Sequence, residues 1–542
     1  MVKSKSRLLL AALVLAVPAA TASTVAAAAG VGPQAGTPRP VLVHPAPAGV
    51  RARPAAVVPL RVPSPSAYAA QKAAANAAAA RLAAPASGPA VAPLAPSLVR
   101  NWAGQSDTTD APSDSTGAIG TSRYIELVNS KVALYSRTSN TPTASGPLLK
   151  LTGCVTTNCT GDSAFDVQVI WDPGTKRFFY TTMDLSTSGN LLLFGWSTTA
   201  TPSLSAASWC RFALGFATLR DYPKLGDTKD FMLIGTNNFN GKNFVGSSIT
   251  WVAKPSAGSS CPTAFPKHGT TGTLKNANGS PAFTPVPANQ TDTSSTGWAV
   301  ARPVSIPASG ATFLTLFKVT KSATGKATIP TTGTSVPVAA YKVPAAAPQP
   351  GTAFKLDTQD ARPTQAVSAI DPAHKSAMAL WTQHTVFGGA GAQVRWYEIK
   401  PATHSLIQHG AISSSSLFTF NGAISPDRRV NGTTKMFGRA MVISVNQSSA
   451  SALATIMVAS KIGTNAISPL TLVATSASAD TGFDCTNSHN LCRWGDYAGA
   501  SPDPASPTTG TTGQVWGSSM LSAPGGSASS AGWTTGNFAV KP

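Results

Sequence analysis

The sequence predicts an all-β protein: a β-propeller of six or seven blades, preceded by a disordered segment rich in alanine and proline. Short apolar runs bounded by turn residues recur through residues 100–540, with few helix signals. These runs group into units of roughly 40–60 residues with three or four strands each, as propeller blades require. Two units begin with similar sequence motifs, Asp221-Tyr222-Pro223-Lys224-Leu225-Gly226 and Arg493-Trp494-Gly495-Asp496-Tyr497.

Residues 1–22 have the organisation of a signal peptide. Lys3, Lys5 and Arg7 form a basic start, residues 8–17 form an apolar core, and Ala20-Thr21-Ala22 offers a small-x-small cleavage site. The apolar stretch is shorter than the roughly 20 residues that span a bilayer as a helix. We therefore expect a secreted, extracellular protein without a transmembrane segment in its mature chain, loosely associated with the cell wall through its basic tail.

Residues 23–98 form the predicted disordered linker. Frequent proline blocks helix formation, and few large apolar side chains are present to offset the entropy of ordering. The alanine-rich run 69–84 is compatible with one short helix. The propeller domain is expected to occupy residues 99–542.

Charge argues against a nucleic-acid partner. Only 11% of residues are charged, against about 25% in ordinary soluble domains, so Ser, Thr, Asn and Gly must supply most of the polar surface. The formal charge is +20, but ten basic residues and no acidic ones lie in residues 1–100. The rest of the chain has no Lys/Arg cluster interleaved with aromatic residues, so no nucleic-acid binding is expected.

Six cysteines agree with export. Pairing near neighbours gives Cys154–Cys159 and Cys485–Cys492 and leaves Cys210–Cys261, one of fifteen connectivities. No pair has Cys-x-x-Cys spacing and no His-x-His or His-Glu-x-x-His motif occurs, so no metal site is expected. The stretch 237–241 offers oxygen ligands for a structural calcium ion, although a plain hairpin turn explains it better.

The first expected strands follow residue 117. Two apolar runs within residues 124–135, separated by Asn129-Ser130-Lys131, predict a strand–turn–strand. We expect these strands to complete the last blade, so that no sheet edge stays open. The next unit has strands at 167–171, 177–182 and 191–196.

The later units follow from the same alternation of apolar runs and turns. Asp221 begins one unit, with strands at 231–237 and 244–252 joined by a hairpin turn at Asn240-Gly241. Residues 311–319 form the clearest strand of a fourth unit. The remaining strands are expected at 365–370, 377–382 and 394–399, then at 422–425, 436–445 and 454–459, and finally within 494–521 and 533–540.

Several of these short sequence motifs resemble those of a family of uncharacterised secreted bacterial proteins with a sialidase- or kelch-like propeller. They are Gly117-Ala118-Ile119-Gly120 with Tyr124 and Val128-Asn129, the stretch 221–226 with 236–239, Val394-Arg395-Trp396-Tyr397-Glu398, and 493–497. The resemblance covers roughly residues 115–540 and implies the fold and secretion, but no catalytic residue. The chain departs from the family at Phe165-Asp166-Val167, where Gly-Asp-Pro is usual, and lacks an Asp-His pair near Arg362.

Three aspartates are the candidate catalytic residues. Asp166, Asp221 and Asp496 each precede an apolar run, so they are expected to ring one mouth of the central channel, with Tyr222 and Tyr497 beside them. Paired carboxylates with a nearby tyrosine can hydrolyse a glycosidic bond, one as the acid and one as the base or nucleophile. Alternatively, each aspartate only caps the start of its strand by accepting backbone N–H bonds.

Arg395, Arg493 and Lys224 are the candidate ligand-binding residues. An arginine can hold an anionic sugar through two parallel hydrogen bonds. The alternative is that the two arginines stack on Trp396 and Trp494 or pair with Glu398 and Asp496 inside the blades.

The sequence therefore favours a secreted, monomeric propeller that recognises an extracellular polysaccharide or a cell-surface protein at its channel mouth. The alternative is an extracellular glycoside hydrolase or polysaccharide lyase that uses the Asp and Tyr residues named above. Convergence of Asp221 and Asp496 in an open pocket favours the enzyme, and full hydrogen bonding of each carboxylate favours the binding protein.

Overall fold

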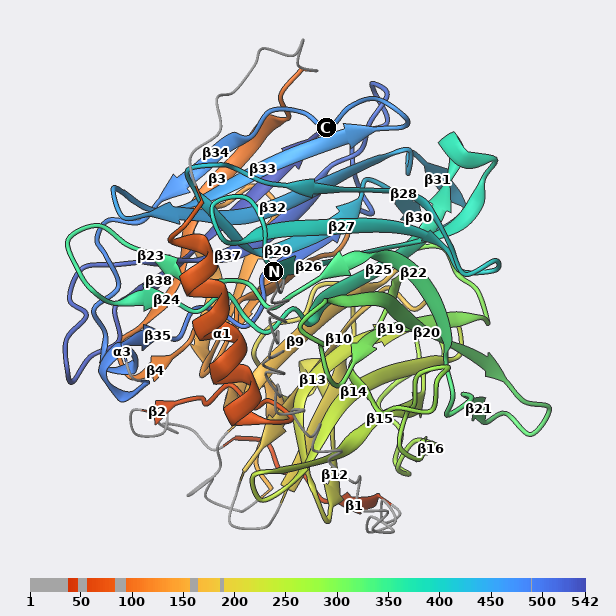
Figure 1. Ribbon diagram of the computed structural model, residues 1–542. Helices are drawn as coiled ribbons and strands as arrows, with labels where there is room; N and C mark the ends of the chain where they lie inside the picture. Colours follow the sequence, from red (N-terminus) through yellow and green to blue (C-terminus); the bar gives the residue numbers. More distant parts are fainter. Residues whose placement is uncertain (1–37, 47–55, 83–93, 156–163, 186–189, 489) are drawn as a thin grey trace, which may run out of the picture. The chain divides into compact units, whose positions relative to one another are not determined.

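Seven antiparallel meanders of four strands organise the part of the chain that the structure describes (Figure 1). This computed structural model describes residues 38–46, 56–82, 94–155, 164–185, 190–488 and 490–542, all within one structural unit. The expected signal peptide, residues 1–22, lies outside these ranges. No helix among the described residues is both long and apolar enough to cross a membrane.

The first three meanders run consecutively along the chain. The first contains β5 (Thr116–Ile119), β6 (Arg123–Val128), β7 (Lys131–Ser136) and β8 (Pro142–Pro147). The second contains β9 (Ala164–Asp172), β10 (Arg177–Asp184), β11 (Asn190–Ser197) and β12 (Trp209–Phe216), and β1 (Arg39–Val41) pairs with β12. The third contains β13 (Leu219–Asp227), β14 (Phe231–Asn240), β15 (Asn243–Ala253) and β16 (His268–Thr270).

The next two meanders are joined by a short parallel pairing. The fourth contains β17 (Ala282–Pro287), β19 (Gly297–Pro303), β20 (Ala311–Lys321) and β22 (Thr334–Tyr341), and β21 (Ala327–Thr328) also pairs with β20. The fifth contains β25 (Pro363–Asp371), β26 (Ala377–Val386), β27 (Gln393–Lys400) and β28 (Ser405–Ile412). Strand β18 (Asn289–Gln290) pairs in parallel with β25.

The last two meanders complete the set. The sixth contains β29 (Phe418–Pro426), β32 (Ala440–Ser449), β33 (Ala452–Ile462) and β34 (Thr471–Thr475). The seventh contains β36 (Gly499–Pro502), β37 (Val515–Ser522), β38 (Trp533–Lys541) and β3 (Ser97–Asp107). Smaller sheets join β2 (Ala56–Val57) to β4 (Asp110–Ala111), β24 (Lys355–Leu356) to β23 (Ala347–Pro348) and β35 (Leu491–Cys492), and β30 (Arg429–Asn431) to β31 (Thr434–Met436).

The first strands of the meanders form a ring. Strands β5, β9, β13, β17, β25, β29 and β36 contact one another in that order, and β36 contacts β5. These strands are buried along almost their whole length. A ring of meanders whose first strands line the centre has the arrangement of a β-propeller, so the all-β part of the predicted fold class is confirmed.

The prediction of which strand closes the ring was wrong. Residues 124–135 form β6 and β7, which belong to the first meander and not to the last. Strand β3 instead pairs antiparallel with β38, so the seventh sheet takes one strand from the N-terminal side of the propeller. This pairing covers the edge of β38, and β3 becomes the outer strand of the seventh sheet.

Part of the expected linker is ordered. Helix α1 (Pro65–Ala79) begins at Ser64, whose hydroxyl accepts the N–H of Ala67, and it buries Lys72 and Ala75. The described residues of 23–98 therefore depart from the predicted disorder. Their order comes from hydrogen bonds to distant parts of the chain, which composition does not reveal; Lys72 Nζ, for example, donates to Thr358 Oγ1 at 2.8 Å.

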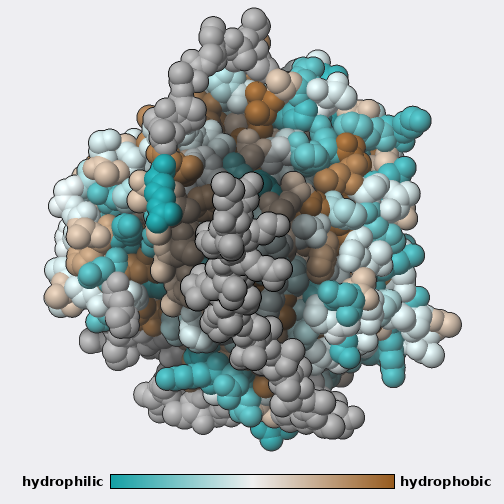
Figure 2. Space-filling view, viewed as in Figure 1, coloured by the Kyte–Doolittle hydropathy of each residue, from teal (hydrophilic) through white to brown (hydrophobic). Residues whose placement is uncertain are grey.

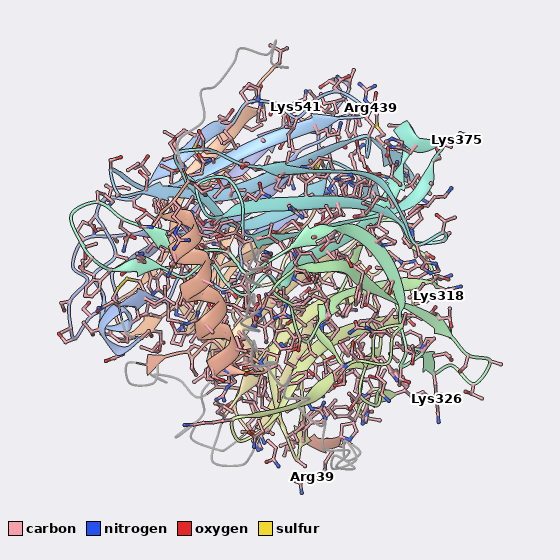
Figure 3. All side chains as sticks on the ribbon, viewed as in Figure 1. Arg39, Lys318, Lys326, Lys375, Arg439 and Lys541 are labelled. Atoms are coloured by element: carbon pink, nitrogen blue, oxygen red, sulfur yellow. A yellow bond between two sulfur atoms is a disulfide. The ribbon has the colours of Figure 1, made fainter. Side chains whose placement is uncertain are left out.

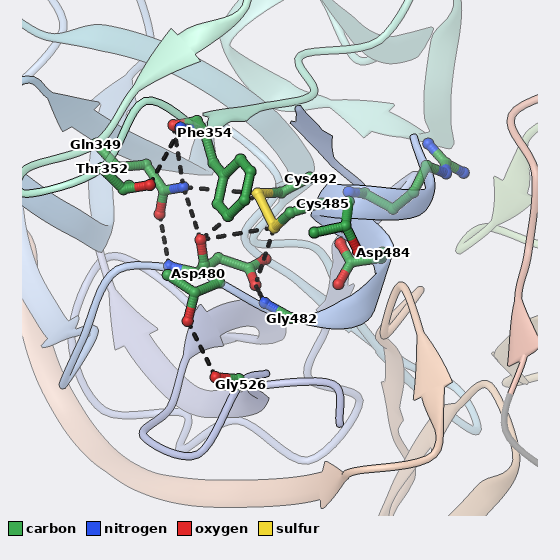
Figure 4. Close-up of a disulfide and its surroundings, with 12 residues drawn as sticks. Gln349, Thr352, Phe354, Asp480, Gly482, Asp484, Cys485, Cys492 and Gly526 are labelled. Atoms are coloured by element: carbon green, nitrogen blue, oxygen red, sulfur yellow. Dashed lines mark hydrogen bonds between the residues drawn. A yellow bond between two sulfur atoms is a disulfide. The ribbon is translucent and has the colours of Figure 1, made fainter. Parts of the chain in front are cut away.

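Two of the expected disulfides are present among the described residues. Cys210 bonds to Cys261, and Cys485 in α3 (Phe483–Asn487) bonds to Cys492 (Figure 4). The second bond lies beside Asp480, whose N–H and carbonyl group both bond to the Gln349 side chain. Cys154 is disulfide-bonded, and its expected partner Cys159 lies outside the described residues.

The surface of the molecule reflects the small share of charged residues in the chain, which is 11%. On the face drawn in Figure 2, hydrophilic and intermediate residues prevail, and hydrophobic residues form small groups. The basic side chains labelled in Figure 3 come from different elements and lie apart from one another, as Arg39, Lys318 and Lys541 illustrate. The remaining helical turns are α2 (Leu149–Thr152), η1 (Ala206–Ser208) and η2 (Pro372–His374).

Closure of the ring predicts a strong effect at Trp102 in β3. Its ring packs against Tyr124 and Tyr135 of the first meander and Trp516 of the seventh, with centroids 5.6–5.8 Å apart. We expect Trp102→Ala to lower the free energy of unfolding by about 3–5 kcal/mol, measured by urea denaturation. Leu94→Ala, at a side chain 94% exposed, is the control. Equal stability of the two variants would contradict this role.

Candidate functional site

The predicted aspartates lie at the start of the inner strands, where the backbone is irregular. The pairing of β9 with β10 and of β13 with β14 shifts by a bulge at Asp166 and Tyr222. Both residues have left-handed φ values, +57° and +56°. A bulge redirects a side chain, and a left-handed non-glycine residue costs energy that its surroundings must offset. The offset here comes from hydrogen bonds.

These hydrogen bonds connect neighbouring meanders. The Asp166 N–H donates to Asn129 Oδ1 at 2.8 Å, and the Tyr222 N–H donates to Asp166 Oδ2 at 3.2 Å. Asp114, immediately before β5, accepts the Asp496 N–H at 2.6 Å. The capping role foreseen as the alternative to catalysis is therefore present for Asp166. The caps cross from one meander to the next instead of staying within one strand.

Asp114, Asp166, Asp221 and Asp496 form one group, which we call the strand-start cluster. Each side chain is at most 4% exposed. Burial, followed by the neighbouring Asp221 and Asp496 carboxylates, raises the pKa of Asp166 to about 7. Burial also raises the pKa of Asp221 to about 7, against the effect of Arg362 and Arg61. Hydrogen bonds through Tyr222 and through the Asp496 backbone thus connect these residues, and their burial keeps them from lining an open pocket.

Cations and aromatic rings surround this cluster. Arg493 donates to Asp496 Oδ1 at 2.6 Å and to Asp357 Oδ2 at 3.2 Å, so the predicted pairing of Arg493 with Asp496 is present. Lys224 Nζ lies 3.1 Å from the ring centroid of Tyr497 and has no hydrogen-bond partner among the described residues. Burial lowers its pKa well below the usual value, although Asp114, Asp166 and Asp496 oppose this shift.

The two predicted tyrosines hold the cluster together. Their rings meet edge to face with centroids 5.7 Å apart. The Tyr222 hydroxyl donates to the Asp496 carbonyl oxygen at 2.8 Å, and the Tyr497 hydroxyl donates to the Val167 carbonyl oxygen at 2.9 Å. Both hydroxyls thus bond to backbone groups of other meanders.

Residues 56–79, which we call the covering segment, lie over the strand-start cluster. Arg61 Nε is 3.5 Å from Asp221 Oδ1, and the Val58 carbonyl oxygen accepts from Arg493 Nε at 3.0 Å. From α1, which Figure 1 draws across the ends of several strands, the Tyr68 hydroxyl donates to Asp357 Oδ1 at 3.1 Å. The covering segment therefore closes the mouth at which a ligand site was predicted.

Arg395 does not belong to the cluster. Its guanidinium donates to the carbonyl oxygens of Ala339 and Ala340, both at 2.9 Å, in the neighbouring fourth meander. Among the described residues it forms no ion pair with Glu398, so the predicted pairing is not observed. The suggested oxygen site at residues 237–241 is a β14–β15 hairpin, and its turn lies one residue later than predicted, between Asn240 and Asn243.

An open cleft lies at the opposite ends of the inner strands. Asp172 ends β9 and Asp227 ends β13, whereas Asp166 and Asp221 lie at the starts of the same strands. The cleft has a volume of about 490 Å³. Its lining is polar, with carboxylate, ammonium, hydroxyl and amide groups from Asp172, Thr175, Asp227, Lys229, Asp230, Lys254, Gln290, Thr293 and Lys321.

The base of this polar cleft is a buried ion triplet. Lys254 Nζ lies 2.9 Å from Asp172 Oδ2 and 2.8 Å from Asp227 Oδ2. Burial lowers the pKa of Lys254, but the two carboxylates more than offset this, so its pKa is raised. Burial raises the pKa of Asp227 to about 6, against the effect of Lys254. The triplet joins the second and third meanders. Above it, Lys321 pairs with Asp230, whereas Lys229 and Thr293 are exposed to solvent.

Sequence reasoning missed Asp114, Asp227, Lys254 and Arg362. Asp172 directly follows the predicted strand 167–171, and Asp227 directly follows the motif 221–226 that marked the third meander. Aspartates stand at both ends of the predicted inner strands. This pattern was the available signal for two sites, one at each mouth of the channel. Nothing local marked Lys254, because its partners Asp172 and Asp227 are distant in the chain. Arg362 pairs with Asp360, only two residues away, and this neighbouring pair was the signal available for it.

Comparison with known proteins finds remote structural similarity only. No family model and no curated protein matches the chain. Similar solved structures are β-propeller proteins. They include a Synechocystis apocarotenoid oxygenase mutant (10% identity, 67% of this chain and 70% of that one, TM-score 0.36), the Dos1 propeller (11%, 82% and 94%, 0.35) and a GH43_1 enzyme from Xanthomonas citri (10%, 59% and 86%, 0.26). At these identities no residue role is transferred.

The raised pKa values in the cluster predict how stability depends on pH. A carboxyl group whose pKa is about 7 when folded and about 4 when unfolded stabilises the fold below pH 4 and loses that effect as pH rises to 7. We expect Asp166→Asn to reduce the fall in unfolding free energy between pH 4 and pH 7 by up to about 4 kcal/mol.

Urea denaturation at several pH values measures this difference. The asparagine retains a side-chain oxygen to accept the Tyr222 N–H. Asp230→Asn is the control, because Lys321 keeps the pKa of Asp230 below its usual value against the effect of its limited burial. The same pH dependence in wild type and Asp166→Asn would show that Asp166 does not titrate in this range.

Proposed function

We propose that this protein is a secreted β-propeller that binds an extracellular polysaccharide in the polar cleft. The observation that carries the proposal is the lining of that cleft, where hydroxyl, amide, carboxylate and ammonium groups converge at one end of the inner strands. Sugars present alternating donors and acceptors, and such side chains bond to both kinds of group. The seven meanders are proposed as seven blades, and the disulfides support export to an oxidising compartment.

The chemistry of the cleft favours binding over hydrolysis. Asp172 and Asp227 are two carboxylates close enough to contact one lysine, a spacing at which glycosidases use an acid and a nucleophile. Lys254 forms an ion pair with both of them, however, and they are only 2–3% exposed. A carboxylate engaged in this way cannot approach an anomeric carbon, so the pair serves as a fixed base beneath the exposed ligand-binding groups.

Blocking the cleft should abolish binding. Thr293 is exposed in the lining, and an indole at this position would fill part of the 490 Å³ volume. We expect Thr293→Trp to weaken binding of the polysaccharide that wild type selects on a glycan array by at least about 10-fold, or about 1.4 kcal/mol, by calorimetry.

Thr434→Trp is the matched control, since Thr434 is an exposed threonine on β31, which does not line the cleft. It should bind as wild type does. Failure of the wild-type protein to bind any polysaccharide, or equal affinities of Thr293→Trp and Thr434→Trp, would contradict the proposed binding site.

A second candidate function is catalysis at the strand-start cluster. The observation in its favour is that Asp166 and Asp221 have pKa values of about 7, the range that a general acid requires near neutral pH. Substrate would reach them only if the covering segment moved away, because Arg61, Val58 and Tyr68 occupy that mouth. The binding proposal requires no such movement and is therefore preferred.

The two functions differ in what Asp221 and Asp496 do. We expect Asp221→Asn and Asp496→Asn proteins that fold to bind polysaccharide as wild type does, because both residues lie at the other end of the inner strands. We also expect no release of reducing sugar from cell-wall or plant polysaccharides by any of the three proteins. Turnover by wild type that falls by about 100-fold or more in either variant would establish the enzyme instead.

A further inference from the structure

A separate group of three side chains lies at the end of the fifth meander. An oxygen of Asp371, a nitrogen of His374 and an oxygen of Glu398 all lie within 4.8 Å of one another. His374 Nδ1 contacts Asp371 Oδ2 closely and is 3.9 Å from Glu398 Oε1. Asp371 ends β25, His374 ends η2 and Glu398 belongs to β27, so three elements bring these groups together.

In each of the two carboxylates, one oxygen accepts a hydrogen bond from outside the group of three side chains, and the other oxygen faces that group. Asp371 Oδ1 accepts the Ala373 N–H at 2.7 Å, which leaves Oδ2 facing His374. Glu398 Oε2 accepts from Gln408 Nε2 at 2.5 Å. Such outer hydrogen bonds orient ligands in metal sites and fix which atom faces the ion.

Glu398 Oε1 is buried without a hydrogen-bond partner in the described structure. The Glu398 side chain is only 1% exposed, so water does not solvate this oxygen freely. A buried carboxylate oxygen without a partner is costly, and a second carboxylate close by increases the cost. A positive charge between Asp371 and Glu398 would offset this cost.

The neighbouring lysines do not supply that charge by direct contact. Lys461 interacts electrostatically with Glu398, but its ammonium donates to the Asn465 carbonyl oxygen, and the described structure has no ion pair between the two. Lys375 follows His374 with a left-handed φ of +59° and is exposed to solvent (Figure 3). The space between the two carboxylates and the imidazole is thus without a side-chain cation.

We propose that Asp371, His374 and Glu398 bind a divalent transition metal ion, with Zn²⁺ as the best match. One imidazole nitrogen and two carboxylate oxygens suit zinc, whereas calcium takes six to eight oxygen ligands. Small side-chain shifts would give bonds of about 2.0–2.2 Å to an ion at the centre. The His374 side chain is 24% exposed, which leaves an entry path and room for water as a fourth ligand. The prediction from sequence that there is no metal site is replaced by this proposal.

Zinc titration of the chelator-treated, untagged protein tests the site. Isothermal calorimetry at pH 7.5 should show one Zn²⁺ bound per chain, and a Ca²⁺ titration should show much weaker binding. His374→Ala and Glu398→Gln should each weaken Zn²⁺ binding by about 100-fold or more. His374 lies at the surface, so its alanine variant is expected to fold even if Glu398→Gln does not.

The control is His409→Ala, because His409 is an exposed histidine on β28 of the same meander. It should bind Zn²⁺ as wild type does. A zinc-dependent rise in melting temperature, present in wild type and absent in His374→Ala, gives a second readout. Absence of stoichiometric binding by wild type, or equal affinities of wild type and His374→Ala, would overturn the proposal.

Discussion

Contacts across the seams between meanders are what hold this propeller in a ring. The inner strands of neighbouring meanders belong to separate sheets, so, apart from the short parallel pair of β18 with β25, the hydrogen-bond ladders within the sheets do not join them. Polar side chains do so instead, as in the bonds from the Asp166 N–H to Asn129, from the Tyr222 N–H to Asp166 and from the Thr284 N–H to Asn237. A buried N–H group needs a hydrogen-bond partner. Because that partner lies on the next meander, each such bond also fixes the distance between two meanders.

This constraint explains why the strand-start cluster is both charged and buried. Carboxylates are strong acceptors for backbone N–H groups, but collecting several of them raises their pKa values and requires cations nearby. Arg362 and Arg493 meet this need through ion pairs with Asp360, Asp357 and Asp496. The cluster acts as a polar core for one end of the ring, and the covering segment shields it from solvent.

The two ends of the inner strands therefore differ in how far their polar groups are exposed to solvent. At the starts, charge is satisfied internally by Arg493, Lys224 and the covering segment. At the other end, the triplet of Lys254, Asp172 and Asp227 is satisfied at the base of the polar cleft, and exposed groups such as Lys229 and Thr293 remain available above it. The proposed metal site lies on this same side of the fifth meander, since Asp371 is the last residue of β25.

Many of the strands, the Cys210–Cys261 and Cys485–Cys492 disulfides and the all-β class could be predicted from the sequence, because alternation, turns and cysteine spacing are visible in the chain itself. Residues 167–171 and 311–319, for example, lie within β9 and β20. The sequence also singled out Asp166, Asp221 and Asp496, which stand at the starts of inner strands. The order of α1 over them, the closing strand β3 and the approach of Glu398 to Asp371 and His374 become visible only in the folded chain. These outcomes rest on pairs far apart in the chain, such as Lys72 with Thr358, and no local pattern encodes which distant partner a buried charge will find.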